Sequence, residues 1–270
     1  MTQTVFDRSE RQAWAGKAEA YAAGFAKLCA YTVPALLHAA GVREGMRVLD
    51  AGTGTGTVAA AARELGAEVT AVDAEPDMVA RAARTVPEAD VRLASLPRLP
   101  FADGRFDTVL GNFVLNHVGR PRAALRELRR VTRPGGRVAV TVWAAPPAAG
   151  HALLGRAVQA AGVVRPAHLP ALAPEDDFPR TERGLTALLG EAGLREPACT
   201  TLVWDHRTTR EEWWSGPASG VATIGQILAG QPDAVLAEVK RRFDELCAQF
   251  TGPDGALVLP HAALAAHGRA

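Results

Sequence analysis

The chain has 270 residues, 48% of them hydrophobic, and its 30 lysines and arginines against 29 aspartates and glutamates leave a net charge of +1. This length can bury one large core with a modest cap, and the balanced charge lacks the basic surplus that nucleic-acid binding requires. The three cysteines are scattered without CxxC spacing, so neither a disulfide framework nor a zinc site is indicated. No apolar run reaches the roughly 20 residues of a membrane span. We therefore expect a soluble, cytoplasmic protein with no nucleic-acid partner, no membrane contact and no metal.

The first half of the chain predicts helices followed by alternating strands and helices. Helices are expected within residues 11–40. Strands are then expected at residues 46–49, 68–72, 91–93, 106–110 and 137–142, with helices at 58–65, 77–85 and 121–131. This alternation implies right-handed crossovers and predicts a parallel, Rossmann-like α/β sheet.

The pattern becomes less regular beyond Trp143. Further helices are expected at residues 148–161, 182–191 and within 209–250, and further strands at 197–205 and 256–259, before a short tail. We therefore expect one compact unit with three parts. These are a helical lid at 1–40, a ligand-binding core at 41–145 and a region at 146–270 that completes the sheet. The last part contains an inserted helical cap at about 207–250.

The strongest local signal is the segment VLDAGTGTG at residues 48–56, in which a strand leads through a glycine turn into a helix. Gly52 and Gly54 lack the side chains that would block a ligand from approaching the backbone. Amides at the start of the following helix favour a carboxylate or phosphate. The alternative is that the glycines only form a tight turn between strand and helix.

An acidic residue, Asp73, ends the second strand, 73 − 52 = 21 residues beyond Gly52. This spacing is close to that at which an acid meets ribose hydroxyls, although Asp73 could instead cap the helix that Pro76 begins. The dinucleotide fingerprint places a third glycine where this chain has Thr57. The glycine turn and Asp73 together predict an adenosine-containing ligand. Thr57 in place of the third glycine disfavours a nicotinamide dinucleotide.

Several segments between residues 42 and 143 resemble the class I S-adenosylmethionine-dependent methyltransferases. Within this class, they resemble in particular the branch that includes the ubiquinone and menaquinone C-methyltransferases and many small-molecule methyltransferases. The segments are VLDAGTGTG at 48–56, AVD at 71–73, LPRLPF at 96–101, FDTV at 106–109 and LRRVTRPGG at 128–136. The resemblance implies S-adenosyl-L-methionine as cofactor, and a mainly parallel seven-stranded sheet with an antiparallel last strand.

The resemblance also implies a role for each cofactor-binding position. The methionine part would lie against Asp50, Ala51, Gly52, Thr53, Gly54 and Gly56, the ribose on Asp73, and the adenine near Ala74, Met78, Ser95 and Leu96. Gly111 and Asn112 match the place where the family puts a backbone acceptor for the methionine ammonium. The family often has an acid where Ser95 stands, so backbone contact at Leu96 is expected to recognise the adenine edge.

The acceptor side is less defined. The segment NFVLNHV at 112–118 is not the Asn/Asp-Pro-Pro-Tyr/Phe motif of relatives that methylate amide or base nitrogens, which argues against DNA and glutamine acceptors. His117 is a candidate base or acceptor-orienting group, because its pKa is naturally near neutrality. The alternative is a histidine held by backbone or packing near a helix start. His151, His168 and His206 are expected to be surface or packing residues.

Aromatic residues on both sides of the core are the candidate substrate-binding residues. They are Trp14, Tyr21, Phe25, Trp213 and Trp214. Tyr21 ranks first, because relatives fold an N-terminal helix over the cofactor there. The alternative is that these rings join the cap to the sheet, and adjacent Trp213 and Trp214 cannot both face one way on a helix.

We therefore expect methylation at oxygen or carbon of a quinone, polyketide, terpenoid or aromatic metabolite, in bacterial secondary metabolism, by a possible homodimer. A cyclase or decarboxylase of the same fold that keeps the cofactor without methyl transfer remains an alternative. So does a non-catalytic binding module, against which intact Gly52, Gly54 and Asp73 argue. A nicotinamide-dependent reductase is disfavoured, because no plausible Tyr-Lys pair is present.

Overall fold

A seven-stranded sheet lies at the centre of the computed structural model, which describes residues 3–270. The strands have the order β3-β2-β1-β4-β5-β7-β6. Neighbours among β1 to β5 are parallel, whereas β7 is antiparallel to both β5 and β6. The strands are β1 (Arg47–Ala51), β2 (Glu68–Asp73), β3 (Asp90–Leu93), β4 (Phe106–Asn112), β5 (Thr132–Trp143), β6 (Arg195–Thr208) and β7 (Leu257–Arg269). The predicted Rossmann-like fold is confirmed.

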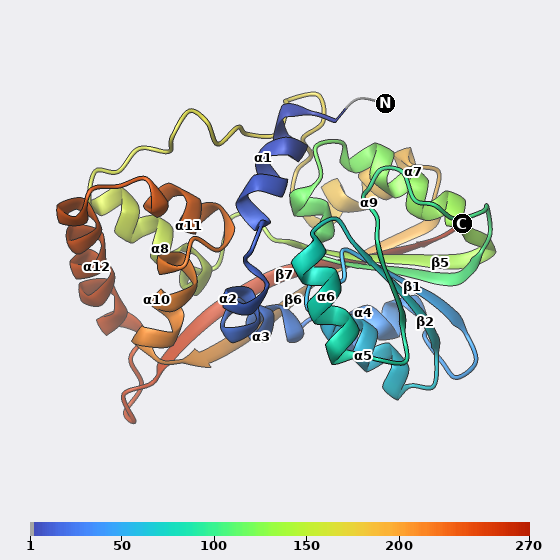
Figure 1. Ribbon diagram of the computed structural model, residues 1–270, viewed down its shortest axis with the longest axis horizontal. Coiled ribbons are helices and arrows are strands. Elements are labelled where there is room, and N and C mark those ends of the chain that lie inside the picture. The colour runs from blue at the N-terminus through green and yellow to red at the C-terminus, as the bar shows by residue number, and fades with distance from the viewer. Residues whose placement is uncertain (1–2) are drawn as a thin grey trace.

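Helices cover both faces of the sheet and one of its ends (Figure 1). The earlier helices are α1 (Val5–Trp14), α2 (Ala18–Ala23), α3 (Phe25–Ala30), α4 (Val33–Ala40), α5 (Thr57–Glu64), α6 (Pro76–Thr85), the 3-10 helix η1 (Val114–His117) and α7 (Pro121–Val131). The later helices are α8 (Ala149–Ala160), α9 (Glu182–Glu191), α10 (Arg210–Ala218), α11 (Ala222–Ala229), α12 (Asp233–Cys247) and the 3-10 helix η2 (Ala248–Phe250). None of the helices described over residues 3–270 is long and apolar enough to cross a membrane.

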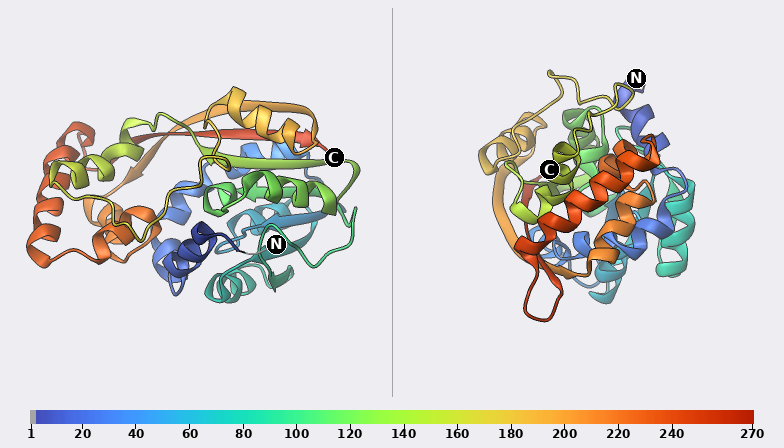
Figure 2. Two further views of the ribbon diagram at one scale, coloured as in Figure 1. Left: turned by 90° about the horizontal axis from the view of Figure 1, so that it is seen from above. Right: turned by 90° about the vertical axis from the view of Figure 1, so that its left-hand side faces the viewer.

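Three buried clusters fix this arrangement. Leu36 of α4 packs with α5 on one face of the sheet, and Leu125 of α7 packs with Leu188 of α9 on the other. The third cluster joins α8, α10, α11 and α12 through residues such as Leu153 and Phe243. These four helices form a cap beside the sheet, at the end where β6 and β7 extend beyond the other strands (Figures 1 and 2).

The prediction of a short last strand at 256–259 was wrong in its extent. Strand β7 continues to Arg269, through the segment 263–266 of sequence Ala-Leu-Ala-Ala, in which every residue is at most 4% exposed. Alanine has little strand propensity of its own. Pairing decides the conformation here, because Ala263 lies opposite Trp143 of β5 and Leu202 of β6.

The first helix begins earlier than predicted, at Val5 rather than near Arg11. Thr4 and Asp7 form a capping box, in which the Asp7 amide donates to Thr4 Oγ1 at 3.0 Å and the Thr4 amide donates to Asp7 Oδ2 at 2.9 Å. Such a pair satisfies amides that have no partner within the helix. The Thr-x-x-Asp spacing was therefore an available signal for this start.

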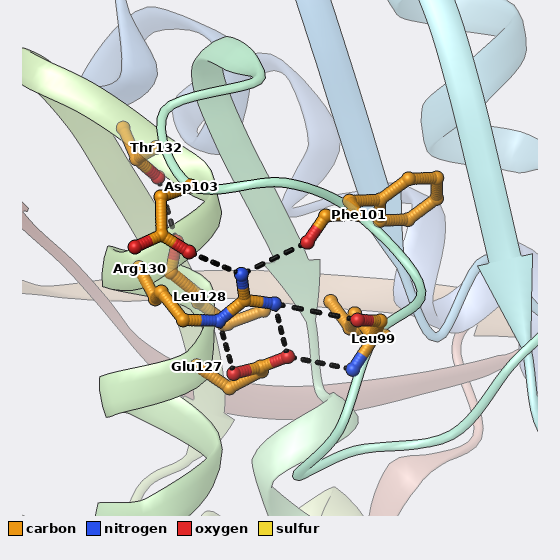
Figure 3. A network of polar contacts seen from close by, with 7 residues as sticks. All are labelled: Leu99, Phe101, Asp103, Glu127, Leu128, Arg130 and Thr132. Atoms are coloured by element: carbon orange, nitrogen blue, oxygen red, sulfur yellow. Dashed lines mark hydrogen bonds and ion pairs between the residues drawn. The ribbon is translucent and has the colours of Figure 1, made fainter.

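A charged network holds the loop between β3 and β4 against α7 (Figure 3). Arg130 donates from Nε and Nη2 to the two carboxylate oxygens of Glu127 at 2.8 and 2.7 Å. It also donates from Nη1 to Asp103 at 2.6 Å and to the Phe101 carbonyl at 2.8 Å. Glu127 in turn accepts from the Leu99 amide at 2.6 Å. The loop that carries Leu99 is thereby pinned to the helix through both side chains.

Replacing Arg130 by alanine is expected to lower the free energy of unfolding by about 2–3 kcal/mol, because several hydrogen bonds between charged groups are lost together. Urea denaturation followed by circular dichroism measures this change. Arg126→Ala is the matched control, since Arg126 is exposed on the same helix. Equal losses in the two variants would contradict a structural role for the network.

Candidate active site

A cavity of about 1000 Å³ opens at the carboxyl ends of β1, β2 and β4 and continues to the cap helices. Gly52 and Gly54 follow β1, Asp73 ends β2 and Asn112 ends β4, and all four line the cavity. The crossover connections change direction between β1 and β4 in the sheet order. Ligands of open α/β sheets bind in the crevice at such a point.

The glycine turn has the backbone conformation that requires glycine. Gly52 and Gly54 have φ values of +73° and +55°. A Cβ atom on Gly52 would lie 2.4 Å from Val114 Cγ2, and one on Gly54 would lie 3.5 Å from the ring of Tyr21. Side chains at either position would therefore fill the cradle between the turn, η1 and the N-terminal helices.

Asp73 joins the glycine turn to the start of α6. Its Oδ2 accepts from the Gly54 amide at 2.8 Å, and its Oδ1 accepts from the Glu75 amide at 3.0 Å. Glu75, rather than Asp73, occupies the N-cap position of the helix and makes no side-chain cap bond. The carboxylate is thus oriented by two amides while it lines the cavity. Burial raises the pKa of Asp73, and the backbone amides oppose that rise.

Asp50 lies beneath the turn, is fully buried and is not part of the cavity wall. Thr53 Oγ1 donates to its Oδ2 at 2.6 Å, while Oδ1 has no hydrogen-bond partner among the described residues. Burial raises the pKa of Asp50 to about 7. The carboxyl group supports the loop from behind through its bond to Thr53. It also keeps its proton at pH values well above those at which an aspartate usually ionises.

Replacing Asp50 by asparagine is expected to change how stability depends on pH. In the wild type the unfolded chain loses this proton near pH 4 and the folded chain near pH 7, so the free energy of unfolding falls as pH rises through that window. Asp50→Asn removes this contribution. Urea denaturation measures the free energy of unfolding of both proteins. Between pH 4 and 7 this free energy should fall in the wild type relative to the variant. A difference in the free energy of unfolding that stays constant with pH would contradict this account.

The predicted cofactor residues divide into two groups. The structure brings together in the cavity wall Gly52, Gly54, Asp73, Ala74, Met78, Ser95, Leu96 and Asn112. It places outside the wall Asp50, Ala51, Thr53, Gly56 and Gly111. In this second group the glycines have a packing role, since a Cβ on Gly56 would lie 3.2 Å from Ala82 Cα.

Asn112 is held by the protein through its side chain. Its Oδ1 accepts from Thr32 Oγ1 at 2.7 Å and from Thr141 Oγ1 at 2.5 Å, and its Nδ2 donates to the Cys29 carbonyl at 3.1 Å. These bonds tie α3 and α4 to the ends of β4 and β5. The side chain of Asn112 is therefore fixed in orientation where it lines the cavity.

Helix α1 lies over the cavity and is fastened to η1 and the loop that follows it. His117 Nδ1 is 2.7 Å from Glu10 Oε2, and Trp14 Nε1 donates to the same carboxylate oxygen at 3.2 Å. The Gly119 amide donates to Asp7 Oδ1 at 2.7 Å. His117, the base candidate from the sequence, lines the cavity, and one of its nitrogens is engaged in holding α1. Glu10 and Asp7 were missed, because nothing in their local pattern indicates this contact.

The aromatic candidates also divide. Trp14, Tyr21, Phe25 and Trp213 line the cavity. Trp214 lies outside it and packs against Phe243 of α12, with ring centroids 5.4 Å apart.

Cavity residues that sequence reasoning missed come from several different elements. They are Arg11, Phe113, Trp143, His151 and His261. Arg11 Nη2 donates to Ser95 Oγ at 2.8 Å, at the expected adenine edge. Among residues 3–270, no group of three or more His, Cys, Asp or Glu side chains is arranged to hold a metal ion.

These residues fit S-adenosylmethionine. The cradle at Gly52 and Gly54 leaves room for a ligand against the backbone, as the methionine part requires. Asp73 presents an oriented carboxylate to the cavity, as ribose hydroxyls require. Met78 is a buried apolar residue in the cavity wall, as an adenine ring would require.

Comparison with known proteins finds similar chains. Residues 49–140 match the family described as "Methyltransferase domain". A demethylmenaquinone methyltransferase from Beutenbergia cavernae is 44% identical over 113 residues, which are 42% of this chain and 47% of the relative. An uncharacterised protein of Mycobacterium tuberculosis is 32% identical over 249 residues, which are 87% of this chain and 86% of that protein. The crystal structure of the YcgJ protein from Bacillus subtilis has a TM-score of 0.55 and 20% identity, over 88% of this chain and 97% of its own.

These similarities differ in what they cover. The match to the demethylmenaquinone methyltransferases spans about half of their length. The mycobacterial protein matches along most of both chains, and the YcgJ structure shares the fold. The chain belongs to the class I S-adenosylmethionine-dependent methyltransferases.

Proposed function

We propose that the chain transfers the methyl group of S-adenosylmethionine to oxygen or carbon of a small, largely apolar acceptor. One observation carries this proposal: a single cavity of about 1000 Å³ joins the cofactor residues to aromatic side chains of the lid and the cap. Pockets for small molecules usually measure roughly 300–1000 Å³, so this volume suits a cofactor together with a second ligand.

The bound cofactor supplies a methyl group on sulfonium sulfur that is already activated for transfer. The chain's own residues must then align the acceptor and exclude water. Trp14 and Tyr21 close the cavity from the N-terminal side, and Phe25 and Trp213 form apolar wall toward the cap. Burial raises the pKa of Tyr21, so its hydroxyl stays protonated and acts as a hydrogen-bond donor.

The acceptor class follows from these walls. Flat aromatic side chains favour a quinone, polyketide, terpenoid or similar aromatic metabolite. The relatives named demethylmenaquinone methyltransferases, whose names indicate a quinone acceptor, support the same class. A bacterial cytoplasm, secondary metabolism and a homodimer stay predictions, and light scattering of the purified protein measures the last of them.

The proposal is tested by incubating the purified protein with methyl-labelled S-adenosylmethionine and a panel of such metabolites. We expect label in an organic-extractable product and an equal amount of S-adenosylhomocysteine. Label found only in proteins or nucleic acids would overturn the acceptor class. Conversion of a metabolite without S-adenosylhomocysteine would indicate a cyclase or decarboxylase, and cofactor binding without any turnover would indicate a binding module.

A further inference from the structure

His151 stands in the first turn of α8 and lines the cavity from the cap side. Its ring meets that of Trp143 edge to face, with centroids 4.5 Å apart and an interplanar angle of 84°. Neither of its nitrogens is hydrogen-bonded to a described residue, and neither is sealed in the protein interior. His151 therefore offers a free imidazole to whatever enters the cavity.

Ring contacts connect this imidazole to the residues at the end of β4. Phe113 follows Asn112 at the end of β4, and its ring stacks on Trp143 with centroids 4.2 Å apart. Phe113 has a φ of +58°, a conformation that bulky side chains rarely adopt and that recurs at functional sites. Trp143 thus links His151 to Phe113, where the cofactor half of the cavity meets the apolar half.

Each of the other histidines of the region has at least one nitrogen engaged or enclosed, or lies outside the cavity wall, although His117 also lines the cavity. His117 Nδ1 contacts Glu10 at 2.7 Å in the lid. His261 Nδ1 donates to the Leu259 carbonyl at 2.8 Å, and its Nε2 is buried without a partner. His206 is buried and lies outside the wall of the large cavity. Among these four described histidines, His151 is the one whose two nitrogens are both accessible and without a hydrogen-bond partner.

Resting on the proposed function, we propose that His151 is the general base for a planar acceptor that carries a phenolic or enolic hydroxyl. The hydroxyl donates to a nitrogen of His151 while its oxygen faces the methyl group. As the oxygen–carbon bond forms and the carbon–sulfur bond of the cofactor breaks, the hydroxyl proton passes to the imidazole. The products are a methyl ether, S-adenosylhomocysteine and an imidazolium that returns its proton to water.

The surroundings keep this imidazole neutral before the reaction. Burial lowers the pKa of His151. From β7 it faces His261, with ring centroids 5.9 Å apart, and burial lowers the pKa of His261 to about 4. Of the charged groups that share the cavity wall, Arg156 of α8 donates to Gln249, and Arg180 is paired with Asp177. A neutral imidazole can accept a proton, and general bases of this kind contribute about 10²–10⁴-fold to rate.

The first test uses no turnover. The ionisation of para-nitrophenol, followed by its absorbance, is titrated with pH in the presence of protein and S-adenosylhomocysteine. We expect the apparent pKa of the bound phenol to be about 1 unit lower on wild type and on the exposed control His168→Gln than on His151→Gln, because the imidazole accepts its proton. Identical titrations on wild type and His151→Gln, or no binding of the phenol, would overturn the proposal.

The second test measures turnover of para-nitrophenol, naphthol and a hydroxynaphthoquinone, after calorimetry has shown that each variant binds S-adenosylmethionine. His151→Gln should lower kcat for naphthol by about 100-fold at neutral pH, and less for the more acidic para-nitrophenol, which needs little help to ionise. Equal losses for both phenols, or no methyl ether from any of them, would overturn the proposal. Failure of the wild type to bind S-adenosylmethionine would instead refute the proposed function itself.

Discussion

Asp73→Ala should bind S-adenosylmethionine about 100-fold more weakly than the wild type, which is the largest loss we expect from a single side chain. A carboxylate that accepts from ribose hydroxyls contributes about 1.5–3 kcal/mol for each hydrogen bond, and about 1.4 kcal/mol corresponds to a tenfold change in affinity. The variant also releases the Gly54 and Glu75 amides that Asp73 now orients. Calorimetric titration of purified protein measures the change.

The control for this experiment is Asp77→Ala, which removes an exposed carboxylate from the first turn of α6, outside the cavity wall. We expect its affinity to remain within about twofold of the wild type. If Asp73→Ala binds S-adenosylmethionine as tightly as Asp77→Ala does, the ribose does not bind at Asp73. Circular dichroism of both variants shows whether the fold is retained.

Gly52→Ala should also abolish most of the cofactor affinity, and for a different reason. The new Cβ would lie 2.4 Å from Val114 Cγ2, so either the turn or η1 must move away from the cradle. We expect a loss of at least about tenfold in affinity and a free energy of unfolding lower by about 2–3 kcal/mol, from the collision together with the left-handed backbone.

Gly162→Ala separates the two contributions. Gly162 has a φ of +72°, close to the +73° of Gly52, but a Cβ atom added to Gly162 would have no other atom within 4 Å. This control should therefore lose only the roughly 1–2 kcal/mol of the backbone conformation and none of the cofactor affinity. Equal destabilisation of the two variants would show that contact with Val114 is unimportant.

The cofactor half of the site was predictable because its signals are local. A strand that ends in Gly52 and Gly54 and a second strand that ends in Asp73 place their residues at one edge of a parallel sheet, whatever the rest of the chain does. The structure places all three in the wall of one cavity. It also shows what the pattern could not, namely that Asp50 supports the turn from within the core.

The acceptor half was not predictable, because it depends on contacts between segments far apart in the chain. His151 reaches the cavity only because α8 packs against β7 and α12, and no local pattern around His151 indicates that packing. For the same reason Trp213 and Trp214 could not be told apart until the position of α10 was known. The long pairing of β7 with β5 and β6 was missed, since alanine-rich strands have no strong local signal.

We propose above that one cavity holds S-adenosylmethionine beside an aromatic acceptor site. A crystal structure of the protein with S-adenosylhomocysteine tests it most directly. We expect the ribose at Asp73, the amino-acid part between Gly52 and Asn112, and the sulfur toward Phe113 and Trp143. The ligand bound elsewhere, or bound with its sulfur turned away from these rings, would contradict it.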